Sequence, residues 1–203
     1  MQRIRLTYSK EDNMKFISHS ELIRAFEKAI RRADIPVAFS QGFNPHMKID
    51  FGIPLQIGIT SGCEIMDITT EKKISPDTAE IALNRTLPPG LKISEATEIG
   101  HNRPSIQSHV TAAVYRIILK EGQQPDQKVK DILEQTEIQI IRRTKSGEKK
   151  VDIRPMIKSL KLVDNKLEAT LQSSSSGTLK ANEFLALLEG FDIESIRRIE
   201  LLT

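Results

Sequence analysis

The sequence is poor in the residues that cross-link small proteins or hold metals. Its 203 residues include one cysteine, Cys63, so the chain alone forms no internal disulfide framework and no cysteine-ligated zinc or iron–sulfur site. It also lacks His-Glu-x-x-His, Cys-x-x-Cys and any carboxylate cluster at ligand spacing. We therefore expect no metal or other cofactor, and a reducing compartment.

Long apolar segments and phosphate-binding loops are missing as well. No apolar run approaches the roughly 20 residues that span a bilayer, and MQRIRLTYSK lacks the apolar core and cleavage site of a signal peptide. The glycines of GIPLQIG precede no Gly-Lys-Ser/Thr, so nucleotide hydrolysis is not supported. These absences predict a cytoplasmic protein that contacts no membrane and is more simply a macromolecule-binding protein than an enzyme.

The first half of the chain alternates between strand and helix patterns. The segment 18–34 has helical period, with Ser18 or Ser20 as its cap and an apolar face that includes Leu22 and Phe26. A short strand is expected at 37–40. The main segments follow as strand, helix, strand, strand, helix and strand at 3–9, 18–34, 48–51, 62–70, 76–87 and 91–99, which is the split βαβ order of a ferredoxin-like domain.

The second half repeats this order. It has a strand at 110–119 and a helix at 127–137, then strands, a helix at 181–188 and a final strand at 197–202. The strands between the helices are predicted at 138–144, 149–163 and 166–172, one more than the fold needs. We predict an α+β protein of two tandem ferredoxin-like halves with antiparallel sheets, at 1–100 and 110–203, joined by a linker at 101–109.

The loop 41–46 is the most unusual stretch of the sequence. Gly42 permits a positive φ before Phe43, and Asn44-Pro45 starts a second turn. One interpretation is a rigid loop that presents an aromatic ring, amides and His46 to an RNA base. The other is a tight connection whose Phe43 enters the core.

Cations gather in two further places. On the predicted helix Arg24, Lys28 and Arg31 recur at i, i+4 and i+7, a spacing that fits a phosphate backbone or a plain solvated face. The segment 142–161 is rich in Lys and Arg within a chain whose net charge is only +3, so it is either a phosphate-facing patch or a solvated hairpin. Nothing in this pattern is specific for DNA.

A catalytic alternative uses His19, His46 and Lys48. If the fold brings them together, they supply a base, an acid and a phosphate clamp for RNA cleavage without a metal. His19 sits at the helix start, where the positive end of the dipole favours a neutral imidazole. The alternative is a metal-independent endoribonuclease.

Two blocks of sequence resemble a known family. FISHSELIRAFEKAIRRADIPVAFSQGFNPHMKIDFGIPLQIG at 16–58 with IMDI at 65–68, and VDIRPMIKSL at 151–160, are similar to the radical-SAM-linked family of uncharacterised bacterial proteins. In that family the domain occurs alone or fused to a radical SAM protein. The resemblance therefore implies a radical SAM partner, whose three-cysteine cluster motif this chain lacks, and Met47 stands where the family usually has proline.

The tandem order is also similar to that of CRISPR repeat-processing endoribonucleases, which grip RNA between two such halves. Those nucleases carry a glycine-rich loop near the C-terminus, whereas LLEGFDIESIRR at 187–198 has one glycine, which argues against cleavage. The leading hypothesis is a non-catalytic accessory that presents transfer or ribosomal RNA to a radical SAM enzyme, and the main alternative is a protein-interaction module without RNA. The predicted RNA contacts are Arg24, Lys28, Arg31, Gln41, Phe43, Asn44, His46, Lys48, Arg142, Arg143, Lys145, Lys149, Lys150 and Arg154.

Overall fold

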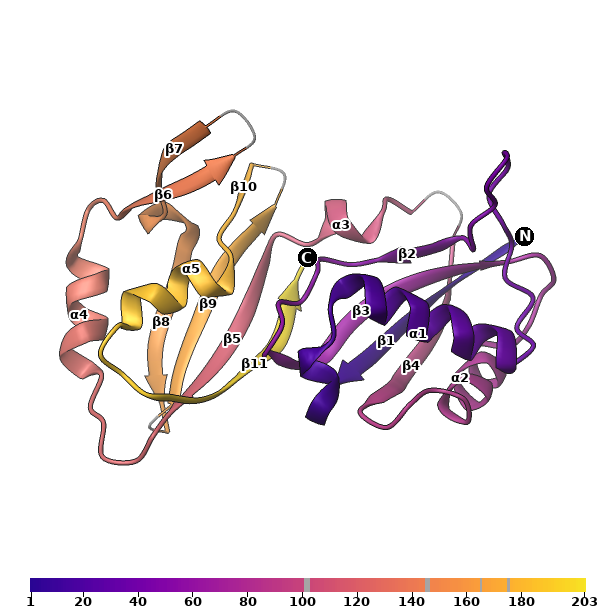
Figure 1. The fold of residues 1–203 in the computed structure, drawn as a ribbon, viewed down its shortest axis with the longest axis horizontal. Coiled ribbons are helices and arrows are strands. Elements are labelled where there is room, and N and C mark those ends of the chain that lie inside the picture. Colours follow the sequence, from indigo (N-terminus) through magenta and orange to yellow (C-terminus); the bar gives the residue numbers. More distant parts are fainter. Residues whose placement is uncertain (101–102, 145–146, 165, 175) are drawn as a thin grey trace. The chain divides into compact units, whose positions relative to one another are not determined.

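The chain forms two units in a computed structural model that describes residues 1–100, 103–144, 147–164, 166–174 and 176–203 (Figure 1). Contacts divide it into unit 1, Met1–Val110, and unit 2, Thr111–Thr203. Each unit combines helices with an antiparallel sheet, so the predicted α+β class is confirmed. None of the described helices is both long and apolar enough to cross a membrane.

Unit 1 has the split βαβ arrangement. Strand β3 pairs antiparallel with β1 and β2, and β1 also pairs antiparallel with β4, which gives the order β2-β3-β1-β4. The two middle strands are therefore not neighbours in sequence order, as the ferredoxin-like fold requires. Its elements are β1 (Gln2–Lys10), η1 (Asp12–Phe16), α1 (His19–Arg32), β2 (Ile49–Phe51), β3 (Thr60–Thr70), α2 (Pro76–Asn84), β4 (Leu91–Ile99) and α3 (Ile106–His109).

Helix α1 begins with a capping box and buries one face. The Ser18 side chain accepts a hydrogen bond from the Glu21 backbone N–H, and the Glu21 carboxylate accepts one from the Ser18 N–H at 2.8 Å. These contacts satisfy backbone donors that no helical partner can reach. The buried residues are Leu22, Phe26, Ala29 and Ile30, which is the apolar face expected from the sequence apart from half-buried Ala33.

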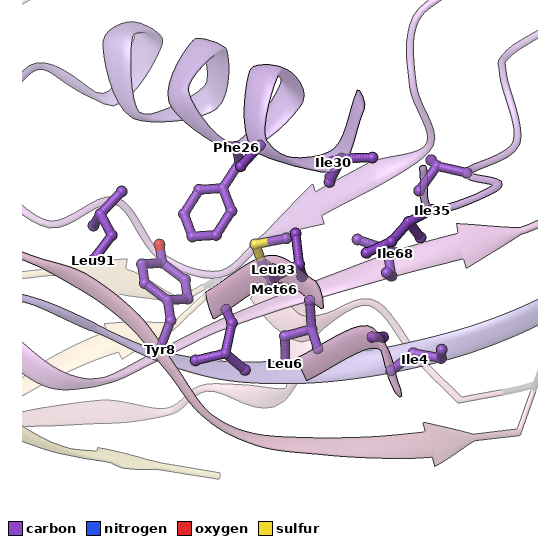
Figure 2. Packing of buried hydrophobic residues seen from close by; sticks show 14 of the residues in the cluster. Ile4, Leu6, Tyr8, Phe26, Ile30, Ile35, Met66, Ile68, Leu83 and Leu91 are labelled. Carbon is purple, nitrogen blue, oxygen red and sulfur yellow. The ribbon is translucent and has the colours of Figure 1, made fainter. Parts of the chain in front are cut away.

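The core of unit 1 lies between its sheet and both of its longer helices (Figure 2). Ile4, Leu6 and Tyr8 from β1 alternate with less buried residues, as a strand with one covered face requires. Phe26 sits over them, with its ring centroid 4.9 Å from that of Tyr8 and 5.7 Å from that of Phe51. The same cluster includes Leu83 of α2, so both helices cover one face of the sheet.

Unit 2 repeats the arrangement of unit 1, and the additional strand predicted from the sequence lies outside its four-stranded core. Its sheet has the order β8-β9-β5-β11, which matches unit 1 element for element. Strands β6 and β7 form a separate two-stranded hairpin between α4 and β8. Its elements are β5 (Ala112–Leu119), α4 (Asp126–Glu134), β6 (Gln139–Thr144), β7 (Gly147–Asp152), η2 (Arg154–Met156), β8 (Ile157–Val163), β9 (Lys166–Ser174), β10 (Gly177–Thr178), α5 (Ala181–Leu185), η3 (Ala186–Leu188) and β11 (Ile193–Leu202).

Several predicted boundaries are wrong. The segment 37–40 is no continuous strand and makes only isolated bridges, Val37 with Thr70 and Phe39 with Met47. The long strand expected at 149–163 is broken by η2, because Pro155 lacks a backbone donor and favours a turn. Residues 106–109 of the expected linker form α3, and residues 101–102 lie outside the described ranges, so the linker stays a prediction.

Candidate nucleic-acid interface

The loop after α1 is the closed end of a small hairpin in unit 1. The Ser40 N–H donates to the His46 carbonyl at 2.8 Å, and the His46 N–H donates to the Ser40 hydroxyl at 2.9 Å. Below them, the Lys48 N–H donates to the Ala38 carbonyl at 2.8 Å. Gly42 has a φ of +124°, which confirms the positive φ expected from the sequence. The loop is therefore held at its base and projects from the unit (Figure 1).

Phe43 stands at the tip of this hairpin and is fully exposed. The interpretation in which Phe43 enters the core is thus wrong. Gln41, Asn44 and His46 are also exposed, whereas Lys48 at the base is half-buried. A large aromatic ring in solvent, with amides and an imidazole around it, has the composition of a base-stacking platform.

The cation stripe on α1 is solvent-facing. Arg24, Lys28 and Arg31 are all exposed, on the side of the helix away from the buried residues. Glu27 between them is half-buried. The stripe can offer three positive charges along one side of unit 1, as the spacing in the sequence predicts.

The basic patch of unit 2 does not form one surface. In the β6–β7 hairpin, Arg142 is opposite Lys149, and the neighbouring cations Arg143 and Lys150 lie on the other face, because side chains alternate along a strand. Arg142 is bound by Glu183, with N–O distances of 2.8 and 2.7 Å. Lys145 lies outside the described residues.

Arg154 holds the fold of unit 2 together. Its guanidinium donates to the carbonyls of Gln135 at 3.0 Å, Leu133 at 2.9 Å and Ile157 at 3.4 Å. The first two carbonyls lie at the C-terminal end of α4, where helical acceptors are left without partners. Arg154 is thus committed to a structural contact, which leaves few of its N–H donors for RNA.

Replacing Arg154 with methionine should lower the free energy of unfolding of unit 2 by about 1–3 kcal/mol, because the carbonyls at the end of α4 lose their donors. Arg143→Met is the matched control, since the Arg143 side chain is 90% exposed. It should change stability by less than about 0.5 kcal/mol. Urea unfolding followed by circular dichroism measures both, and equal stabilities of the two variants would contradict the structural role.

His19 lies at the start of α1 against Phe51, with ring centroids 5.5 Å apart. Burial and the nearby Lys10 ammonium lower the pKa of His19, while the Glu64 carboxylate opposes this shift. The imidazole is thus neutral at physiological pH, as expected, and burial and Lys10 favour this form. A neutral imidazole can act as a base but not as a phosphate clamp.

The structure does not bring His19, His46 and Lys48 to one place. His19 is the first residue of α1, whereas His46 closes the base of the hairpin loop that follows the last residue of that helix. Phe51, which His19 contacts, lies five positions after His46 along an extended run, a span of about 15 Å. General acid–base catalysis needs groups within hydrogen-bonding reach of one substrate atom, so this set does not form a catalytic centre.

Sequence reasoning missed the buried charges of unit 1. Lys10 and Glu64 are 1% and 4% exposed, and the Lys10 Nζ donates to the Ile17 carbonyl at 3.1 Å. The signal was available, since Lys10 continues the buried alternation of β1 and Glu64 has the same parity as Met66. Together with His19 they form a polar cluster at one end of the core.

Asp67 forms a second buried ionic cluster on the opposite face of the sheet. Its carboxylate accepts from Arg5 Nε at 2.8 Å and from Arg3 Nη2 at 2.9 Å, and the Asp67 side chain is 1% exposed. The hydrogen bond with Asp67 raises the pKa of Arg5, although burial opposes the shift. Among the described residues, no three His, Cys, Asp or Glu side chains come together as a metal site.

Comparison with known proteins identifies a family. Residues 3–181 match the family described as an uncharacterized protein conserved in bacteria (DUF2344). The chain belongs to this family. The expected resemblance to an uncharacterised bacterial family is thus confirmed for DUF2344, while the radical SAM link and the likeness to CRISPR nucleases stay predictions. No curated protein matches the chain.

Solved structures resemble the DUF2344 chain only distantly. One is a Cbf5–Nop10–Gar1 complex, at 12% identity and a TM-score of 0.45, and another is an archaeal box H/ACA sRNP Nop10–Cbf5 complex, at 11% identity and a TM-score of 0.45. Each match covers 98% of this chain and 48% of the other, so the chain spans about half the length of the solved chains. At this TM-score the likeness carries no argument about function.

Proposed function

We propose that this DUF2344 protein binds RNA through unit 1, with Phe43 stacked on an unpaired base. The observation that supports the proposal is the fully exposed ring at the tip of a braced loop. The Phe43 ring contributes nothing to the core, and both of its faces are open to a partner. Base stacking tolerates any sequence, because every base has a π-face.

The residues around Phe43 fit such a complex. Gln41 and Asn44 offer amide donors and acceptors for base edges, as single-stranded loops of RNA require. The exposed cations of α1, Arg24, Lys28 and Arg31, supply phosphate contacts. The target is a structured RNA with an open loop, such as transfer or ribosomal RNA.

The protein acts as an accessory in this proposal. His19 packs on Phe51 at the start of α1, His46 lies on the loop that follows α1, and the chain has a single cysteine, so this proposal assigns the chemistry to a partner. A radical SAM enzyme that modifies the bound RNA is the partner that the sequence resemblance implies. Held by the accessory, the RNA loop is presented to that enzyme at high local concentration.

Salt dependence tests RNA binding directly. With about three phosphates contacted, log K should fall with log salt at a slope of about −2, so affinity drops roughly 15-fold from about 50 to about 200 mM salt. Filter binding of the purified protein with total bacterial RNA measures this slope. In Arg24→Gln/Lys28→Gln/Arg31→Gln the slope should approach zero.

The control variant for this titration is Lys120→Gln/Lys130→Gln/Lys158→Gln, which removes the same charge from exposed positions of unit 2. It should keep the slope of the unmodified protein. Binding that ignores salt, or no binding at micromolar protein, would overturn the proposal. An equal loss of slope in both variants would mean that net charge alone attracts the RNA.

A further inference from the structure

A groove in unit 2 separates strand β6 from helix α5. It has a volume of about 500 Å³. One wall is the consecutive run 140–144 of β6, and the other consists of Lys180, Glu183 and Ala186. Figure 1 shows β6 as the hairpin strand nearer to α5. A wall made of consecutive residues is the edge of a strand, since side chains alone would line it at every second position.

The edge of β6 that borders the groove has no strand beside it. Among the described residues, β6 pairs only with β7 in a two-stranded sheet. From Ile140 to Arg143, the groove side of β6 therefore presents backbone N–H and C=O groups for another strand.

The groove is preformed. Arg142 donates to both oxygens of Glu183, at 2.8 and 2.7 Å, and to the Thr178 carbonyl at 2.7 Å. Glu183 also accepts from the Lys180 backbone N–H at 3.0 Å. The Arg142 and Glu183 side chains are 25% and 15% exposed, so this bidentate pair fixes the hairpin against α5. A ligand meets both walls already in position, which lowers the entropy cost of binding.

The charged side chains around the groove indicate which kind of ligand it binds. Glu183 is already neutralised by Arg142, and Lys180 is an exposed cation. Arg143 is exposed as well, and its ion pair with Glu148 of β7, at 3.4 Å, lies in solvent, where such a pair is weak. Ile140 and Ala186 add apolar surface between them. We propose that an extended acidic peptide segment of a partner protein adds to the edge of β6 as a third strand, with its carboxylates facing Arg143 and Lys180.

A peptide fits this surface better than RNA does. A strand edge offers alternating donors and acceptors, and another strand satisfies both kinds. Phosphate oxygens only accept hydrogen bonds, so the phosphates of an RNA backbone cannot satisfy the β6 carbonyls, and its 2′-hydroxyl groups do not repeat at the spacing of a strand. Acidic side chains still match the positive charge, and alternating apolar side chains cover Ile140 and Ala186.

A fluorescein-labelled peptide of alternating glutamate and valine is the probe. Fluorescence anisotropy should give saturable binding to the full chain, and a lysine–valine peptide should not bind. In Arg143→Glu/Lys180→Glu, affinity should fall about tenfold or more, because both cations of the groove become repulsive. Lys149→Glu/Lys150→Glu is the matched control, since it makes the same charge change on β7, which does not line the groove, and it should bind within about twofold of the unmodified protein.

Strand pairing has its own readout. Only every second N–H of an added strand faces β6, so N-methylation of one alternating set should abolish binding and methylation of the other set should not. Equal effects of the two methylated peptides, or equal losses in both charge variants, would overturn the inference. Failure of the peptide together with loss of RNA binding in Arg143→Glu/Lys180→Glu would instead assign the groove to RNA. Phe43→Ala should leave peptide binding unchanged, so this test is independent of the RNA proposal.

Discussion

The Phe43→Ala variant should bind RNA about 5- to 150-fold more weakly than the unmodified protein, because one base–aromatic stack contributes about 1–3 kcal/mol. The ring is fully exposed, so its removal leaves the fold intact. The lost affinity should appear equally at low and high salt, since stacking releases no counterions. Phe43→Tyr keeps the π-face and should restore binding.

Phe16→Ala is the control for this experiment. Phe16 is 60% exposed on η1 of the same unit, outside the loop, and loses the same side chain. It should bind RNA within about twofold of the unmodified protein. If Phe16→Ala and Phe43→Ala weaken binding equally, general surface hydrophobicity drives the interaction, and the stacking role of Phe43 is wrong.

The elements with strong periodicity were predictable from the sequence. Strand β4 at Leu91–Ile99 has the predicted bounds, and the buried face of α1 follows from the spacing of Leu22, Phe26, Ala29 and Ile30. The predicted strand boundaries were wrong where a single residue interrupts a strand-like pattern or where the pattern is short. Pro155 breaks a run that reads as one strand from 149 to 163, and the bridges at Val37 and Phe39 are too sparse to make a strand.

The candidate site was only partly predictable. A phenylalanine in a loop has no periodicity, so the sequence left open whether Phe43 is buried or exposed, and the fold decides. Cations were placed correctly on α1, where neighbours along the helix set the exposed face.

In unit 2, partners that lie far away in the sequence decide whether a cation is available to a ligand. Arg142 forms an ion pair with Glu183, and Arg154 donates to the carbonyls of Leu133 and Gln135. No local pattern in the sequence indicates these contacts. Composition identified a basic segment there, but fewer of its side chains are available to a ligand than the count suggests, because the N–H donors of two arginines are engaged within the fold. A charge count along a sequence therefore overestimates a binding surface whenever arginines also serve as structural donors.

Phe26→Ala should lower the stability of unit 1, whereas Phe43→Ala should lower RNA affinity and leave stability unchanged. Phe26 is completely buried between the rings of Tyr8 and Phe51, so its truncation leaves a cavity and should lower the free energy of unfolding of unit 1 by about 3–5 kcal/mol. Phe26→Leu fills part of the space and should cost less, about 1–2 kcal/mol. Phe43→Ala should stay within about 0.5 kcal/mol of the unmodified protein.

Amide hydrogen exchange separates the two units in this comparison. In Phe26→Ala, the protected amides of β1 and β3 should exchange about 150- to 5,000-fold faster, while those of β5 and β9 keep their rates, because contacts divide the chain into two units and Phe26 packs within unit 1. Acceleration in both units would mean that they unfold as one cooperative body. Unchanged exchange in β1 would contradict the central position of Phe26, and RNA binding by the still-folded fraction shows that the loss is one of stability and not of contact.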